Sequence, residues 1–191
     1  MTLANCFNAC TLLLVVFLVQ PVNAQSVSQE HWTPKELEQY AALKRLAEFT
    51  YQHEYNEPFW ETLTTEHLYL DYLLTDTTSV RDKERYNQML GFFVYFKQTV
   101  DSLGVANLDA APVRFYRDHK FYDVFDENKA IKTVGGSSMA LPTDNVFVWY
   151  RKEDPYKVKG ALWFDEESNR LISWILLKQG GAGYFITGKL L

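Results

Sequence analysis

The chain has 191 residues, of which 47% are hydrophobic and 16% aromatic, and its formal net charge is −5 at pH 7. A mildly acidic protein has no general attraction to nucleic acid or to anionic lipid, so we expect no nucleic-acid partner. The length is that of one ordinary globular domain.

The first predicted element is a short apolar segment from Leu12 to Val19. At ~1.5 Å per residue, a helix of this length does not cross a hydrocarbon core of about 30 Å. Val22 and Ala24 follow, at the two positions that signal peptidase recognises just before its cleavage site. We therefore predict a signal peptide over 1–24 that is cleaved after Ala24, a periplasmic or secreted protein, and no membrane span after cleavage. An uncleaved amphipathic anchor is the alternative.

Both cysteines, Cys6 and Cys10, lie within the predicted signal peptide. The cleaved chain, 25–191, would then contain no thiol, which excludes disulfides, thiolate nucleophiles and cysteine metal sites. We expect its stability to come from packing, largely of aromatic side chains, because each buries about 150–250 Å².

Helices are predicted for the region 33–104. The sequence "TPKE" places Thr33 as an N-cap, Pro34 at the first helical position and Glu36 at the third, which is a capping box. The first helix should end near Asn56, before the next proline.

Two further helices are expected, over 58–74 and 80–103, and Gly104 is a natural stop for the second of these. In the 80–103 helix, large apolar residues recur three or four positions apart and form one broad face. These residues are Tyr86, Met89, Phe93, Phe96, Val100 and Leu103. We predict that this helix is the central, most buried one.

From 112 to 188 short β-rich stretches alternate with turns, and 126–143 is the longest irregular segment. The expected strands are 112–117, 120–125, 144–152, 156–164, 170–178 and 183–188. Helices followed by strands indicate an α+β class, with about three N-terminal helices packed on an antiparallel sheet of four to six strands. We predict a single domain over 25–191, helical over 33–104 and β-rich over 112–188.

Motifs that resemble cofactor or metal sites are incomplete. "GYFITGKL" has the spacing of a phosphate loop, but Leu190 stands where serine or threonine is needed. "HEYNE" begins like a zinc-protease helix, but Glu57 occupies the position of the second histidine. We predict no cofactor and no metal site.

Two histidines are candidates for general-base catalysis. His67 lies four positions before Asp71, a spacing at which a carboxylate can orient an imidazole on a helix. An exported hydrolase that uses His67 or His119 is therefore one hypothesis, and it requires other polar groups to converge on the same pocket.

Aromatic residues on the predicted strands are the candidate binding residues. They are Phe147, Trp149, Tyr150, Trp163 and Trp174. The strands are more apolar than a sheet with one wet face requires. Either the first two helices cover the second face, or this face binds a partner protein or a ligand.

Two stretches, "WTPKELEQYAALK" (32–44) and "RDKERYNQML" (81–90), resemble a family of periplasmic accessory proteins encoded by integrating conjugative elements. The resemblance implies an accessory role in the envelope part of a DNA-transfer apparatus. Our first hypothesis is a non-enzymatic periplasmic interaction protein of a secretion or conjugation apparatus with a protein partner in the cell envelope. The second is a cup-shaped binder of a small apolar ligand.

Overall fold

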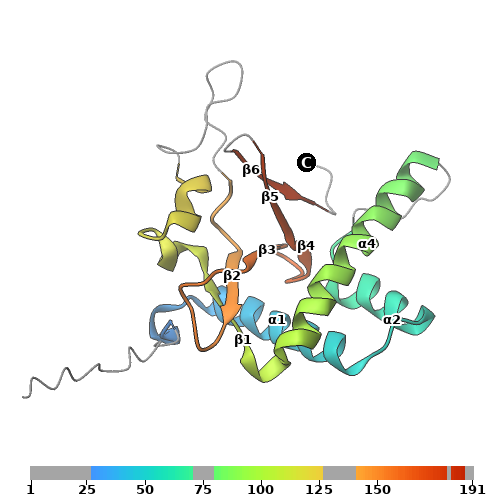
Figure 1. Ribbon diagram of the computed structural model, residues 1–191, viewed down its shortest axis with the longest axis horizontal. Helices are drawn as coiled ribbons and strands as arrows, with labels where there is room; N and C mark the ends of the chain where they lie inside the picture. Colours follow the sequence, from blue (N-terminus) through green and yellow to red (C-terminus); the bar gives the residue numbers. More distant parts are fainter. Residues whose placement is uncertain (1–26, 71–79, 127–140, 180–181, 188–191) are drawn as a thin grey trace, which may run out of the picture.

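The computed structural model describes residues 27–70, 80–126, 141–179 and 182–187 (Figure 1). Three α-helices precede a four-stranded antiparallel sheet and a two-stranded sheet, which confirms the predicted α+β class. The predicted signal peptide and most of the predicted loop 126–143 lie outside the described residues. No described helix has both the length and the apolar character that a membrane span requires.

The first helix, α1 (Pro34–Gln52), begins with the predicted capping box. The Thr33 hydroxyl accepts from the Glu36 N–H at 3.1 Å, and the Thr33 N–H donates to the Glu36 carboxylate at 2.7 Å. The helix ends before the expected Asn56, because His53 adopts an extended backbone and its ring hydrogen-bonds the Phe49 carbonyl at 2.8 Å.

The second helix is shorter than expected. It runs as α2 (Glu57–Thr62), continues as a π-helical turn over Leu63–His67 and then becomes extended. The expected end near 74 is wrong for a tertiary reason: the buried Leu68 forms a parallel bridge with Leu171, and the Tyr69 N–H donates to the Leu171 carbonyl at 2.9 Å.

The third helix, α4 (Val80–Leu103), has the predicted bounds. It is followed by Gly104, whose φ of 74° is a backbone conformation that favours glycine. Four residues of the predicted apolar face are buried in the core: Met89, Phe93, Phe96 and Val100.

The main sheet is a meander whose spatial order follows the chain. Its strands are β1 (Leu108–Pro112), β2 (Val146–Arg151), β3 (Gly160–Phe164) and β4 (Leu171–Ser173). A separate hairpin follows, made of β5 (Ile175–Gln179) and β6 (Ala182–Ile186).

The predicted strands 112–117 and 120–125 are wrong. These stretches form 3₁₀ segments over Val113–Tyr116 and Lys120–Val124, and β1 lies earlier in the chain. Pro112 is the last residue of β1, and it has no N–H with which to continue the ladder. The predicted strand 170–178 is also divided, because Trp174 separates β4, which pairs with β3, from β5, which pairs with β6.

Both faces of the main sheet are buried, which accounts for the apolar character of its strands. Phe147 and Trp149 lie on one face, where Trp149 contacts Phe96 of α4 with ring centroids 5.9 Å apart. Tyr150 lies on the other face, 6.2 Å from Tyr116. At this position a 3₁₀ segment, rather than one of the first two helices, provides the contact.

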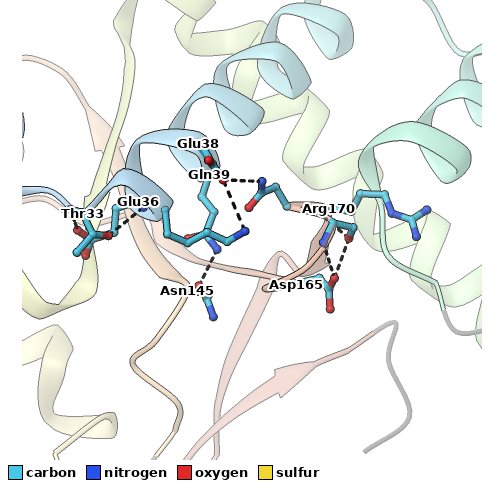
Figure 2. Close-up of polar contacts among 10 residues, drawn as sticks. Thr33, Glu36, Glu38, Gln39, Asn145, Asp165 and Arg170 are labelled. Carbon is cyan, nitrogen blue, oxygen red and sulfur yellow. Dashed lines mark hydrogen bonds and ion pairs between the residues drawn. The ribbon is translucent and has the colours of Figure 1, made fainter.

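The helix α1 is also tied to two turns of the β region (Figure 2). The buried Gln39 donates to the Asn145 side chain at 2.7 Å, and the Asn169 amide donates to Glu38 at 3.3 Å. Asn145 and Asn169 have positive φ values of 60° and 56°. Asparagine tolerates this conformation better than most residues, and α1 holds both turns in place.

A second tie joins the start of α1 to the 3₁₀ segment after β1. The Arg114 guanidinium donates to both carboxylate oxygens of Glu36, at 2.6 and 2.8 Å, and to the His31 carbonyl at 2.7 Å. Burial alone would raise the pKa of Glu36, but the hydrogen bonds from Arg114 and Thr33 outweigh it and hold the pKa below its ordinary value.

This pKa shift predicts the pH dependence of stability. Because Glu36 binds its proton more weakly in the folded chain, its stabilisation is present above the unfolded pKa of about 4.3 and is lost as the pH falls through the lower folded value. Glu36→Gln should lower the free energy of unfolding by ~1 kcal/mol at pH 7, since Arg114 is partly exposed. Urea unfolding of both proteins between pH 3 and 7 measures this; equal differences at every pH would contradict it.

A glycine pair tests the packing of the sheet against α4. A Cβ on Gly160 would lie 2.6 Å from the buried indole Nε1 of Trp149, so Gly160→Ala should cost ~1–3 kcal/mol in the free energy of unfolding. Gly91→Ala, measured at high dilution, is the matched control, because no described residue lies within 4 Å of a Cβ there and alanine favours the helix by ~0.5–1 kcal/mol. Denaturant unfolding of both variants should give changes of opposite sign.

Candidate functional site

A hollow of about 380 Å³ lies between α4 and the start of β5, and the two elements diverge from this point in Figure 1. We call it the α4–β5 groove. Its lining is almost entirely apolar and mostly aromatic. The lining residues are Phe92, Tyr95, Phe96, Thr99, Trp149, Trp174, Ile175 and Leu177.

Two buried tryptophans are held in the groove by the core of the fold. Trp149, from β2, contacts Phe96 with ring centroids 5.9 Å apart. Trp174, between β4 and β5, meets Phe93 at 5.6 Å and an interplanar angle of 77°, an edge-to-face arrangement. Because both indoles are more than nine-tenths buried and packed against α4, this part of the groove is formed before anything binds.

The rim of the groove is exposed and apolar. Tyr95 of α4 is 68% exposed, and Leu177 of β5 and Tyr184 of β6 are 47% and 50% exposed. Leu177 and Tyr184 are directly opposite in the β5–β6 ladder, so their side chains share one face of the hairpin. The apolar surface therefore extends from the groove onto the hairpin.

This part of α4 carries no exposed charge. Between 88 and 100 its one charged residue is Lys97, which is 94% buried. The Lys97 ammonium donates to the Thr50 carbonyl at 2.7 Å and to Asp101 at 3.0 Å, so its charge is used to tie α4 to α1. Within the described part of the chain, the indole N–H groups of Trp149 and Trp174 have no hydrogen-bond partner, and no cluster of metal-ligating side chains occurs.

The five aromatic residues proposed from the sequence are separated in the structure. Trp149 and Trp174 line the groove together. Phe147 and Tyr150 are completely or almost completely buried in the core. Trp163 is partly exposed and packs on Phe185 of β6 with ring centroids 5.6 Å apart.

Sequence reasoning missed the contribution of α4 to the groove. It placed Phe93 and Phe96 on the apolar face of the helix, and both are buried in the core. Phe92 and Tyr95 lie beside that face and line the groove instead. The sequence did contain one signal for this surface. Gly91 is a glycine inside the helix, it stands beside aromatic residues, and the core does not require a glycine at that position.

His67 is positioned by ring contacts. It stacks on Phe49 with centroids 4.9 Å apart, and burial lowers its pKa. It lines a small hollow of about 150 Å³ that also contains Ser168, but the Ser168 hydroxyl donates to Asp165 at 2.8 Å. Asp71, the predicted partner of His67, lies outside the described residues.

His119 serves as a helix cap. Its Nδ1 accepts the Phe121 N–H at 3.0 Å, so the proton of the neutral ring lies on Nε2 and neither nitrogen is left as a free base. The neighbouring Tyr116 hydroxyl donates to the Pro155 carbonyl at 2.9 Å, and burial raises the pKa of this phenol. Across the described ranges, neither His67 nor His119 hydrogen-bonds to a hydroxyl or carboxylate side chain.

The α4–β5 groove is therefore the strongest candidate site among the described residues. No protein-family model, curated protein or solved structure matches the chain. A function must be inferred from the shape and chemistry of the groove, which offers aromatic surface and no charge.

Proposed function

We propose that this is an exported, non-enzymatic interaction protein that binds a partner protein in the cell envelope through the α4–β5 groove and its rim. The observation that carries the proposal is the exposed, uncharged rim beside two buried tryptophans. Aromatic residues that surround a well-packed centre are typical of binding hot spots, and loss of charged residues is typical of the centre of an interface.

The form of the groove favours a protein over a small molecule. Its walls come from a long helix and a hairpin, and its exposed apolar residues lie on both. A partner segment can therefore contact Tyr95, Leu177 and Tyr184 at the same time. The tryptophans are already held by Phe93 and Phe96, so little side-chain freedom is lost there on binding.

Sequence features support the proposed location and role. The apolar segment before Ala24 and the absence of cysteine after it are consistent with export. The resemblance of 32–44 and 81–90 to periplasmic proteins of integrating conjugative elements supports an accessory role in a secretion or conjugation apparatus. In the structure these two stretches form the start of α1 and the N-terminal half of α4.

The export proposal predicts the amino terminus of the purified protein. If signal peptidase cleaves after Ala24, the chain recovered from its native host begins at Gln25. Amino-terminal sequencing of protein from the envelope fraction measures this. A chain that still begins at Met1 would contradict the proposal and would retain Cys6 and Cys10.

The binding surface is tested by photo-cross-linking in the native host. Replacing the 68% exposed Tyr95 by p-benzoylphenylalanine should give a protein adduct on illumination, because the rim lies against the partner. The same replacement at Tyr51, a 52% exposed residue of α1 that does not line the groove, is the matched control and should give little adduct. Equal yields from the two sites would count against the surface.

A small apolar ligand is the second candidate occupant. The groove volume of about 380 Å³ falls within the range of about 300–1,000 Å³ typical of small-molecule sites. In that case Tyr95 gives no protein adduct, and native mass spectrometry of the same preparation shows an added ligand mass.

A further inference from the structure

The surface of α4 identifies the partner more closely. We propose that the partner is a second copy of this chain, and that two α4 helices pack antiparallel about a two-fold axis at Tyr95. This inference rests on the proposed function, since it takes the α4–β5 groove and its rim as a protein-binding surface.

A stripe of uncharged residues runs along α4 beside the groove. Apart from the adjacent pair Gly91 and Phe92, its members follow one another three or four positions apart, so they lie along one side of the helix. They are Gln88, Gly91, Phe92, Tyr95, Thr99 and Ser102, and all are exposed or partly exposed. The stripe spans about 21 Å of helix at ~1.5 Å per residue, enough for a helix–helix contact of several turns.

The aliphatic hydroxyl groups of the stripe are already satisfied within α4. The Thr99 hydroxyl donates to the Tyr95 carbonyl at 2.9 Å, and the Ser102 hydroxyl donates to the Thr99 carbonyl at 2.9 Å. A neighbouring helix does not have to accept these two donors. Around the centre of the stripe it meets aromatic rings, the Thr99 methyl group, one glycine and the Tyr95 hydroxyl.

Gly91 marks a place where another backbone can approach. It is exposed, and no described residue comes within 4 Å of a Cβ there, so the described part of the fold gives no reason for glycine. Glycine is also the least favourable residue in a helix interior apart from proline. Small residues on helix surfaces let two helices approach closely, which gives this glycine a role if a second helix packs on it.

The stripe is arranged symmetrically about Tyr95. Gly91 and Thr99 lie four residues on either side of it, and Gln88 and Ser102 lie seven residues on either side. In an antiparallel pair centred on Tyr95, each Gly91 therefore faces the partner's Thr99, and each Gln88 faces the partner's Ser102. Small residues meet at two places and polar residues at the ends, as an isologous contact requires.

The charge distribution favours a second copy over a different, oppositely charged partner. The chain has a net charge of −5, so two copies repel unless the surfaces that meet are neutral. Near a two-fold axis every charge faces its own copy, and the stripe carries none. The Lys97 ammonium is buried and paired with Asp101, away from the stripe.

The proposed pair also covers the groove. The partner's Tyr95 lies at the axis, beside the rim formed by Tyr95 of the first copy. Leu177 and Tyr184, on the hairpin across the groove, flank the incoming helix. The exposed apolar residues at the rim are then buried in one contact.

Sedimentation equilibrium of the full purified chain tests the proposal. The wild type should have the mass of a dimer at micromolar concentration. At a concentration where the chain is monomeric, Gly91→Gln should raise the midpoint of thermal unfolding, since glutamine favours a helix. The same substitution should weaken dimerisation at least about tenfold. Tyr95→Glu should give a monomer because two carboxylates would meet at the axis, whereas Tyr51→Glu, the matched control on α1, should remain a dimer.

A disulfide experiment tests the antiparallel register. In a background with Cys6 and Cys10 replaced by serine, the double variant Gly91→Cys and Thr99→Cys should form a covalent dimer on mild oxidation. Within one helix these positions are ~12 Å apart, too far for a disulfide, so each bond must join two copies. The single variants should cross-link much less.

The outcomes separate this inference from the proposed function. A wild-type chain that is monomeric at ~100 µM, or a double variant that cross-links no faster than the single variants, overturns the dimer. If the Tyr95 photo-adduct then contains a different protein, the proposed function stands without the dimer. If Tyr95 gives no protein adduct at all, both fail. A folded Gly91→Gln variant that dimerises like the wild type also overturns the dimer, whether or not Tyr95→Glu folds.

Discussion

The structure depends on the packing of α4 against two tryptophans of the β region. Phe96 meets Trp149 and Phe93 meets Trp174, so neighbouring positions of one helix reach both the middle of the main sheet and the junction of β4 with β5. These contacts join the helical half of the chain to the β half. The groove lies beside these contacts and is lined by both tryptophans.

The two halves are also linked by short polar ties in the first half of α1. Arg114 binds Glu36 at its start, Gln39 reaches Asn145, and the Tyr40 hydroxyl donates to Asp109 at 2.6 Å. Burial and the neighbouring Asp109 carboxylate raise the pKa of Tyr40, so this phenol remains a donor throughout the neutral range. The described residues contain no cysteine and so no disulfide; these ties orient α1 while the aromatic core supplies most of the stabilisation.

The same aromatic surplus has two roles in this fold. Most of it fills a sheet that is buried on both faces, as Phe147 and Tyr150 show. Part of the remainder is exposed at the rim of the groove, as Tyr95 on α4 and Tyr184 on the β5–β6 hairpin, while Tyr51, Tyr55 and Tyr156 are exposed elsewhere. Exposed apolar surface is costly for a monomer to keep, and here it coincides with an uncharged stripe and an unexplained glycine. The proposed function and the proposed dimer both follow from that coincidence.

The sequence by itself determined the elements whose signals are local. The capping box at Thr33, the bounds of α4 and the positions of β2, β3 and β6 follow from hydrogen-bonding and periodicity within a few residues. Tertiary structure alone decided that 113–116 and 120–124 form 3₁₀ segments rather than strands and that Trp174 divides a predicted strand. It also decided which aromatic side chains are in contact. Those outcomes depend on contacts between distant segments, such as Tyr116 with Tyr150, and local periodicity contains no information about a partner far along the chain.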